Sequence, residues 1–324
     1  MKINNSKKRL LVILRSSSES TENLCENLVK NQLQRNDLII KCSYVPFSKT
    51  LEKAYEIAYE EKYSWTLMID SDVLINSMSI ENIIYYGDKY NSLVIQGYVL
   101  DFLYGGPRSG GLHLYSYEAI DKIYSLKPNT YNKERPETFC KNLICPDGYR
   151  FRSIPLILGI HDYFQFENDY YRKILFFYTK NKDIIDLLSN YWKSKKYKII
   201  VEMDTLIKKN VSRNSRNKIG ICTTDLTLPY DFEKQDNSSL LKKISNLDQK
   251  YIDNICMSWY PEILYLKKFT SIYLRLLLKK DFAKLQFKLL IKKKRFLKVG
   301  YHVLKNSLII LIVKILRKLR KFAN

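Results

Sequence analysis

No apolar stretch in this chain approaches the roughly 20 residues that a membrane-spanning helix needs. Near the N-terminus the apolar run covers only residues 10–14, and near the C-terminus only residues 308–313. The first run is also too short for the hydrophobic region of a signal peptide. We therefore expect a cytoplasmic protein.

Paired cysteine motifs are missing as well. The six cysteines are scattered, with no C-x-x-C and no Cys/His spacing of the kind that binds a metal. In a chain of 324 residues, such cysteines are expected to be reduced thiols in a reducing compartment.

Acidic side chains are scarce in one part of the chain, the C-terminal tail of residues 261–324. This tail holds 18 Lys or Arg against only Glu262 and Asp281, whereas the rest of the chain holds 37 basic and 31 acidic side chains. The formal net charge of +22 is thus mainly a property of the tail. Its basic clusters alternate with short apolar clusters, which is typical of amphipathic helices lying on an anionic membrane. Each basic side chain near such a surface contributes about 1 kcal/mol.

Two other interpretations of the tail remain open. Phosphate groups of RNA attract the same basic charges, and a solvated helical hairpin packed on the core would need no partner. The apolar clusters between the basic residues favour lipid. We therefore expect an anionic membrane surface as the partner of the tail and no nucleic acid.

Strands and helices alternate in the first part of the chain. Apolar runs predict buried strands and apolar residues at helical spacing predict helices between them. The strands are expected at residues 8–14, 37–44 and 65–75, and the helices at residues 21–34 and 48–61. This order is typical of a parallel sheet with crossover helices.

Two carboxylates follow the apolar residues 67–69 of the third predicted strand. Asp70 and Asp72 are separated only by Ser71. Burying a carboxylate is costly unless it meets a cation or hydrogen-bond donors, and Mg²⁺ or Mn²⁺ takes oxygen ligands that it shares with a diphosphate. The alternative is a plain turn, since Asp and Ser also start turns and cap helices.

Other polar residues are expected on the same rim of the sheet, because ligands of such sheets bind outside the carboxyl ends of the strands. Arg15 and Ser16 follow the first predicted strand, and His161 and Asp162 follow a later apolar run at residues 153–160. Residues 104–111 hold four of the chain's ten glycines. They predict either a loop that approaches a ligand closely or an ordinary hairpin connection.

The remaining segments give the domain organisation. A short helix is expected at residues 80–86, a strand at 92–100, helices at 164–177 and 181–195, and a polar, proline-punctuated stretch at 127–152. Residues 210–217 have the composition of a linker. We predict a catalytic domain over residues 1–215, a connecting segment over 216–260 and the basic helical tail over 261–324.

The first 180 residues resemble the GT-A-fold, nucleotide-sugar-dependent glycosyltransferases. The resemblance rests on residues 11–16, 48–51, 110–115 and above all the D-x-D strand at 65–75. It implies an α/β fold with a GT-A-like (Rossmann-like), mostly parallel sheet flanked by helices. It also implies Mn²⁺ or Mg²⁺ as cofactor, a nucleotide sugar, UDP-sugar in particular, as donor, and a bacterial role in surface polysaccharide, capsule or lipopolysaccharide synthesis.

The resemblance also implies roles for single residues. Asp72 would bind the metal, Asp70 would contact the metal or the nucleotide, and Arg15 and Ser16 would hold the nucleotide. His161 would be a further metal or diphosphate ligand, with a structural histidine as the alternative; His113 is expected to be structural.

An inverting enzyme also needs a general base. Asp162 and Glu137 are our candidates, with Glu134 and Asp147 as further ones, and a retaining enzyme would need none. Glu137 is expected in a turn at residues 135–138. The chain has no Q-x-x-R-W motif, so a processive synthase is not expected.

We therefore expect a metal-dependent glycosyltransferase at the inner face of the cytoplasmic membrane, acting on a glycan or glycolipid acceptor. A Mg²⁺-dependent nucleotidyltransferase is the alternative enzyme, although it usually has a glycine-rich phosphate loop and residues 15–20 contain no glycine. A non-catalytic membrane- or RNA-binding protein would leave Asp70 and Asp72 without a role.

Overall fold

The computed structural model describes residues 8–44, 46–129, 135–146, 148, 150–180, 185–195, 197–210 and 237–258. The basic tail, most of the predicted linker, and the candidate bases Glu134 and Asp147 lie outside these residues. Among the residues that are described, no helix has both the length and the apolar character that crossing a bilayer requires.

A seven-stranded sheet forms the centre of the protein, in the order β2-β1-β3-β6-β5-β7-β4. Its strands are β1 (Leu10–Arg15), β2 (Leu38–Cys42), β3 (Trp65–Asp70), β4 (Val73–Ile75), β5 (Val94–Asp101), β6 (Gly106–Ser116) and β7 (Phe151–His161). Strands β2 and β3 are parallel to β1, β6 is antiparallel to both β3 and β5, β7 is parallel to β5, and β4 is antiparallel to β7. All strands except β6 and β4 therefore run the same way, which confirms the predicted α/β fold with a GT-A-like, mostly parallel sheet.

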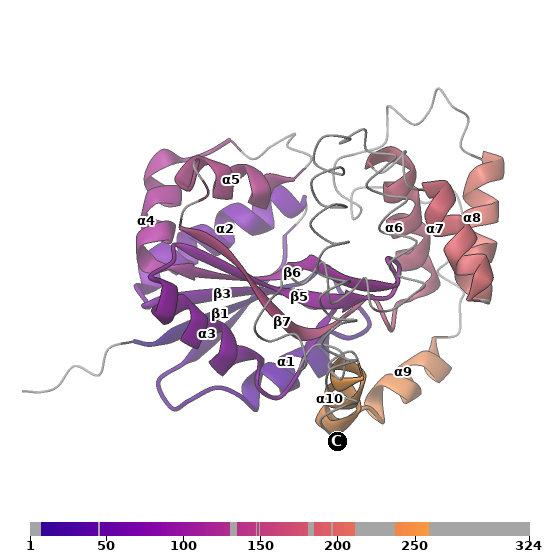
Figure 1. Ribbon diagram of the computed structural model, residues 1–324, viewed down its shortest axis with the longest axis horizontal. Coiled ribbons are helices and arrows are strands. Elements are labelled where there is room, and N and C mark those ends of the chain that lie inside the picture. The colour runs from indigo at the N-terminus through magenta and orange to yellow at the C-terminus, as the bar shows by residue number, and fades with distance from the viewer. Residues whose placement is uncertain are drawn as a thin grey trace, which may run out of the picture.

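Helices cover both faces of this sheet (Figure 1). Those in the first part of the chain are α1 (Glu22–Lys30), α2 (Phe47–Glu61), α3 (Ser79–Tyr90), α4 (Tyr117–Leu126) and α5 (Pro136–Ile144). Helices α1 and α3 contribute to one apolar core and α2, α4 and α5 to the other. The two cores arise because side chains alternate between the faces of a strand. On β1, Leu10, Val12 and Leu14 face one core, while Leu11 and Ile13 face the other.

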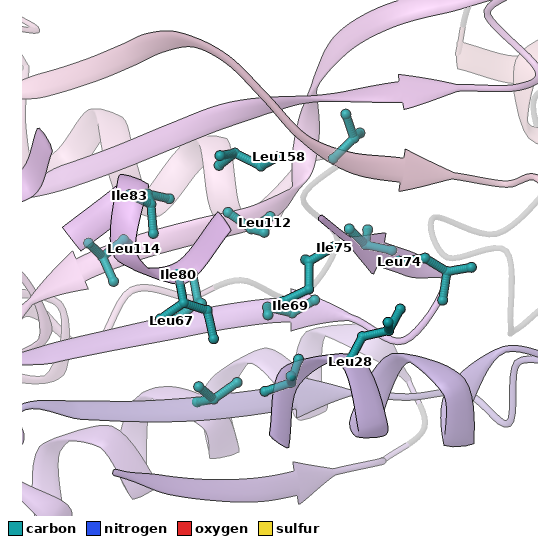
Figure 2. Packing of buried hydrophobic residues seen from close by; sticks show 14 of the residues in the cluster. Leu28, Leu67, Ile69, Leu74, Ile75, Ile80, Ile83, Leu112, Leu114 and Leu158 are labelled. Atoms are coloured by element: carbon teal, nitrogen blue, oxygen red, sulfur yellow. The ribbon is translucent and has the colours of Figure 1, made fainter. Parts of the chain in front are cut away.

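Figure 2 shows the core under α1 and α3, where Leu67 of β3 lies near Ile80 of α3 and Ile69 of β3 lies near Ile75 of β4. Leu112 of β6 belongs to the same core. All of these side chains are almost completely buried. Burial of a side chain of this size stabilises the fold by about 1.5–3 kcal/mol, so this face of the sheet holds the strand ends firmly in place.

The predicted strand at residues 65–75 is two strands, broken at Ser71 and Asp72. Strand β3 lies between β1 and β6, whereas β4 pairs with β7 at the edge of the sheet and is four strand positions away from β3. In a flat sheet that separation would be about 19 Å, but the three steps from Asp70 to Val73 span at most about 11 Å. The sheet must therefore curl, so that the end of β7 returns to the end of β3. The register between β5 and β7 shifts at residues 96–99, and such irregularities let a strand bend.

A third apolar core joins three further helices, α6 (Glu167–Lys180), α7 (Ile185–Ser194) and α8 (Lys198–Asn210). Leu103, at the tip of the β5–β6 hairpin, belongs to the same core, and its carbonyl oxygen accepts a hydrogen bond of 2.8 Å from Trp192 Nε1. The helices predicted at 164–177 and 181–195 correspond to α6 and α7. This helical unit attaches to the sheet through the hairpin.

One local prediction needs correction, and one open alternative is decided. Helix α5 lies within residues 127–152, which were predicted only as a polar stretch; it begins with Pro136, whose fixed φ suits the first turn of a helix. Glu137 therefore lies in that first turn and not in an open turn. Of the two interpretations of the glycine-rich segment, the hairpin connection is confirmed, since Asp101 of β5 pairs with Gly106 of β6.

Helix α10 (Gln249–Met257), in the described part of the predicted connecting segment, packs on the main core. That part also contains α9 (Ser238–Ser245). Ile252 and Cys256 of α10 join the core of α1 and α3. Gln249 Nε2 donates to the carbonyl oxygen of Ile75 over 3.1 Å, so α10 lies against the edge strand β4. The five described cysteines are buried and form no disulfide.

Candidate functional site

The register of the strands brings the predicted site residues to one rim of the sheet. Arg15 of β1 is opposite Asp70 of β3. His161 of β7 is opposite both Asp101 of β5 and Val73 of β4. Because Val73 follows Asp72 directly, the curl of the sheet places the D-x-D segment beside His161.

Asp70, Asp72 and His161 form a group suited to a divalent cation. One ligand atom from each lies within 4.8 Å of the others, and His161 Nε2 is 3.4 Å from Asp72 Oδ1. Asp72 is only 7% exposed, yet none of the described residues donates a hydrogen bond to its Oδ1 atom. A buried polar atom that makes no hydrogen bond is rare in folded proteins and calls for an ion or water. Carboxylate oxygens are the ligands that Mn²⁺ and Mg²⁺ prefer, so Asp70 and Asp72 fit the predicted metal.

The other oxygen of Asp72 binds a lysine. Lys173 Nζ, from α6, lies 2.6 Å from Asp72 Oδ2 and also forms an ion pair with Asp162. Asp162 adopts a φ of 62°, a conformation that costs a non-glycine residue about 1–2 kcal/mol. Burial alone would raise the pKa of Asp162, but His161 and Lys173 outweigh burial and lower it to about 2.

His161 lies at the centre of the rim. Its Nδ1 atom is 2.9 Å from Asp162 Oδ2 and 3.0 Å from Asp101 Oδ2. Burial lowers the pKa of the imidazole, but Asp162 and Asp72 together raise it to about 10. Arg108 pairs with Asp101, and its Nη2 atom is 3.2 Å from His161 Nδ1. His161 is thus enclosed by charged groups, and its roles as metal ligand or structural histidine both stay predictions.

Arg15 is enclosed by two carboxylates. Its Nη2 atom is 2.6 Å from Asp70 Oδ1, its Nη1 atom pairs with Glu137, and only 1% of its side chain is exposed. Burial raises the pKa of Asp70, and Arg15 opposes that rise. In this arrangement Arg15 acts on the site by holding Asp70, and its predicted contact with a nucleotide stays a prediction.

Ser16 is buried as well, and its hydroxyl interacts with Glu22 and with Glu19, whose Oε2 atom is 3.2 Å away. Glu19 also accepts a hydrogen bond from the Ser71 hydroxyl. These contacts tie the segment after β1 to the D-x-D segment. The predicted contact of Ser16 with the nucleotide likewise stays a prediction.

Glu137 belongs to a second, buried polar group behind Arg15. His113 Nδ1 lies 3.3 Å from Glu137 Oε1. Lys141, one helical turn further along α5, places its Nζ atom 3.1 Å from His113 Nε2 and 3.2 Å from Gln96 Oε1. Although burial opposes it, Arg15 and His113 hold the pKa of Glu137 well below its usual value. Both candidate bases, Glu137 and Asp162, are therefore ion-paired, and the assignment of a base stays a prediction.

Gly111 of β6 leaves room beside the candidate metal ligands. Its φ is +71°, and a Cβ atom there would lie 2.6 Å from Val73 Cγ2 and 3.2 Å from His161 Cδ2. Any side chain would push against both residues. The glycine at this position thus permits the close approach of the β6 backbone to the rim.

Sequence reasoning missed three charged residues of this rim: Asp101, Arg108 and Lys173. Asp101 directly follows the predicted strand at 92–100, so the rule that singled out Asp70 would also have found it. Arg108 lies in the glycine-rich segment that was noted only for its backbone. Lys173 is one of many lysines on helices and carried no signal in the sequence.

No protein-family model matches this sequence, and no curated protein matches it either. Among solved structures, the chain is similar to a glycosyltransferase involved in the glycosylation of the major capsid of PBCV-1. The two are 16% identical, the match covers 48% of this chain and 94% of that one, and the TM-score is 0.35.

Two further structures show similar values. S. aureus TarS 1-349 is 12% identical, with 88% of this chain and 91% of that one covered and a TM-score of 0.34. A cytidylyltransferase from Leptospira borgpetersenii is 14% identical, with 69% of this chain and 100% of that one covered and a TM-score of 0.34. None of these similarities assigns an activity, and the chemistry of the site has to come from its own side chains.

Proposed function

We propose that this chain is a metal-dependent glycosyltransferase that moves a sugar from a nucleotide-sugar donor, a UDP-sugar in particular, to a glycan or glycolipid acceptor. The buried Oδ1 atom of Asp72, which accepts no hydrogen bond from the described residues and lies close to Asp70 and His161, is the observation that carries this proposal. It supports a divalent cation at the tip of a D-x-D strand, where the fold class binds its ligands.

In this proposal Asp70, Asp72 and His161 would hold Mn²⁺ or Mg²⁺, and the cation would stabilise the negative charge that develops on the departing nucleoside diphosphate. Arg15 would keep Asp70 in place through the contact of 2.6 Å between Arg15 Nη2 and Asp70 Oδ1. If the reaction inverts the anomeric centre, Asp162 or Glu137 would have to release its ion-pair partners before accepting a proton from the acceptor hydroxyl.

Hydrolysis of UDP-sugars in the presence of Mn²⁺ tests the enzymatic part of the proposal. Asp72→Ala should reduce the rate on the order of 100-fold or more, because it removes a charge that holds the cation. Glu118→Ala is the matched control, since Glu118 pairs with Arg150 on the surface and its side chain is 47% exposed. Circular dichroism should show that both variants are folded.

Three results would contradict the proposal in different ways. Full activity in folded Asp72→Ala would remove the metal site from the mechanism. Activity that survives EDTA would exclude a required divalent cation. Release of pyrophosphate from a nucleoside triphosphate, without UDP-sugar hydrolysis, would identify a nucleotidyltransferase.

We further propose that the tail of residues 261–324 places the enzyme on the inner face of the cytoplasmic membrane, where a lipid-linked acceptor of a capsule or lipopolysaccharide would be presented. The net positive charge of the tail and its apolar clusters support this proposal.

A chain that ends at residue 260 should lose binding to vesicles containing anionic phosphatidylserine and keep UDP-sugar hydrolysis in solution. Neutral phosphatidylcholine vesicles serve as the control, because the basic charges gain little there. Loss of turnover in the folded, shortened chain would show that the tail does more than bind membranes. Unchanged vesicle binding would show that the tail is not the anchor.

A further inference from the structure

Lys173 fills a cation position next to the candidate metal ligands. Its Nζ atom lies 2.6 Å from Asp72 Oδ2 and 3.0 Å from Gln165 Oε1, and it pairs with Asp162. These oxygens belong to the segments that follow β3 and β7, whereas Lys173 belongs to α6. The side chain of Lys173 is only 20% exposed, so its charge is weakly screened by solvent.

Asp72 is shared between this ammonium group and the candidate metal site. One oxygen, Oδ2, faces Lys173, and the other, Oδ1, faces His161. A divalent cation bound to Oδ1 would therefore share a single carboxylate with a fixed positive charge. Two cations this close repel each other strongly where the effective dielectric constant is low, and they also divide the attraction of Asp72.

We infer that Lys173 is a built-in counter-cation that competes with a divalent cation for Asp72 and keeps the affinity of the site for the free ion low. The inference rests on the proposed function, because it takes Asp72 as a metal ligand. The divalent cation then binds well only together with a nucleoside diphosphate, whose negative charges offset the ammonium charge of Lys173.

The same contacts give Lys173 a role when no metal is present. Asp72 and Asp162 are both almost fully buried, and Lys173 pairs with both. Removing one partner of a buried ion pair leaves uncompensated charge and destabilises the fold. Replacing Lys173 should therefore lower the stability of the metal-free chain and make Mn²⁺ stabilise it more.

Binding of Mn²⁺, followed by the electron paramagnetic resonance signal of the free ion, tests this inference without a reaction. Lys173→Met removes the charge and keeps much of the apolar stem, and Lys173→Arg keeps the charge. Lys208→Met is the matched control, because Lys208 Nζ pairs with the buried Asp204 over 2.8 Å in the helical unit. Each protein is titrated with MnCl₂, alone and in the presence of UDP.

In the parent chain UDP should tighten Mn²⁺ binding about tenfold or more, which corresponds to about 1.4 kcal/mol. In Lys173→Met, Mn²⁺ alone should bind about tenfold more tightly than to the parent chain, and the effect of UDP should shrink. Lys173→Arg and Lys208→Met should behave like the parent chain. Lys173→Gln replaces the Met variant if that variant does not fold.

The outcomes separate this inference from the proposed function. If Mn²⁺ binds, Asp72→Ala abolishes the binding, and folded Lys173→Met binds no more tightly than the parent chain, Lys173 does not compete and only the inference is wrong. If neither the parent chain nor Lys173→Met binds Mn²⁺, with or without UDP, there is no metal site and both are wrong. A gain of affinity in Lys208→Met equal to that in Lys173→Met would point to overall charge and overturn the inference.

Discussion

Two buried aspartates of this protein, Asp72 and Asp204, have similar surroundings but differ in how many of their carboxylate oxygens accept hydrogen bonds. Asp72 is 7% exposed and Asp204 is 1% exposed, and each pairs with a lysine, Lys173 at 2.6 Å and Lys208 at 2.8 Å. They differ in their remaining contacts, and that difference separates a candidate ligand from a structural residue.

Both oxygens of Asp204 are occupied. Its Oδ1 atom accepts a hydrogen bond of 2.6 Å from the Tyr178 hydroxyl, and its Oδ2 atom accepts from Ser189 and Lys208. Asp72 has Lys173 on Oδ2, but no hydrogen bond reaches its Oδ1 atom from the described residues. Burial and a lysine partner are therefore common to both aspartates. What marks Asp72 as a site for an ion is an oxygen that accepts no hydrogen bond from the described residues and lies beside Asp70 and His161.

The largest loss of stability should come from removing Asp204, the acceptor shared by Tyr178, Ser189 and Lys208. Asp204→Ala removes the carboxylate that accepts hydrogen bonds from all three residues. We expect the free energy of unfolding to fall by about 3 kcal/mol, as measured by urea denaturation. The Kd for Mn²⁺ of the folded fraction should not change, because Asp204 belongs to the helical unit and not to the rim.

Glu118→Ala supplies the contrast for this measurement. Glu118 and Arg150 form an exposed ion pair, and exposed pairs contribute about 0–1 kcal/mol. If Asp204→Ala lowers the free energy of unfolding no more than Glu118→Ala does, the buried contacts of Asp204 stabilise the fold no more than an exposed ion pair. If Asp204→Ala weakens Mn²⁺ binding in the folded protein, Asp204 also supports the metal site, and the distinction between a ligand and a structural aspartate is wrong.

A smaller effect is expected from filling the space beside the rim. Gly111→Ala adds a Cβ atom 2.6 Å from Val73 Cγ2 and 3.2 Å from His161 Cδ2, at a φ of +71°. The strained backbone and the close contacts should together lower the free energy of unfolding by about 2 kcal/mol. Displacement of His161 should also weaken Mn²⁺ binding, which the same titration measures.

Gly148→Ala isolates the backbone contribution. Gly148 has nearly the same φ, +70°, but in the described part of the chain nothing lies within 4 Å of its added Cβ atom. It should cost about 1 kcal/mol and leave Mn²⁺ binding unchanged. Equal losses of Mn²⁺ affinity in the two variants would show that Gly111 has no particular effect on His161.

Much of the fold followed from local patterns in the sequence. The buried run of β1, the helix α2 and the alternation of strands with helices were all predicted. Because Arg15, Asp70 and His161 each lie at the carboxyl end of a predicted strand, they were expected on one rim, and the register of the strands brings them together there. These features depend on residues that are close in the sequence, and hydrophobic periodicity is a property of such short segments.

The features that were missed depend on contacts between distant segments. Pairing of β4 with β7 requires the curl of the whole sheet, and no local pattern specifies a curl. Lys173 reaches Asp72 across 101 positions of the chain, because α6 packs in a core of its own. The surroundings of Arg15, closed by Glu137 from a helix that was not predicted, are of the same kind.

The connection between β3 and β4 also limits how this protein can vary. Surface loops usually accept added or lost residues with little effect on the fold. This one crosses from the centre of the sheet to an edge strand in three steps, with Val73, Leu74 and Ile75 all buried. An extra residue would exchange the two faces of β4, because side chains alternate along a strand. Homologues and engineered variants that keep this fold should therefore differ here by substitution, while insertions and deletions collect in other loops.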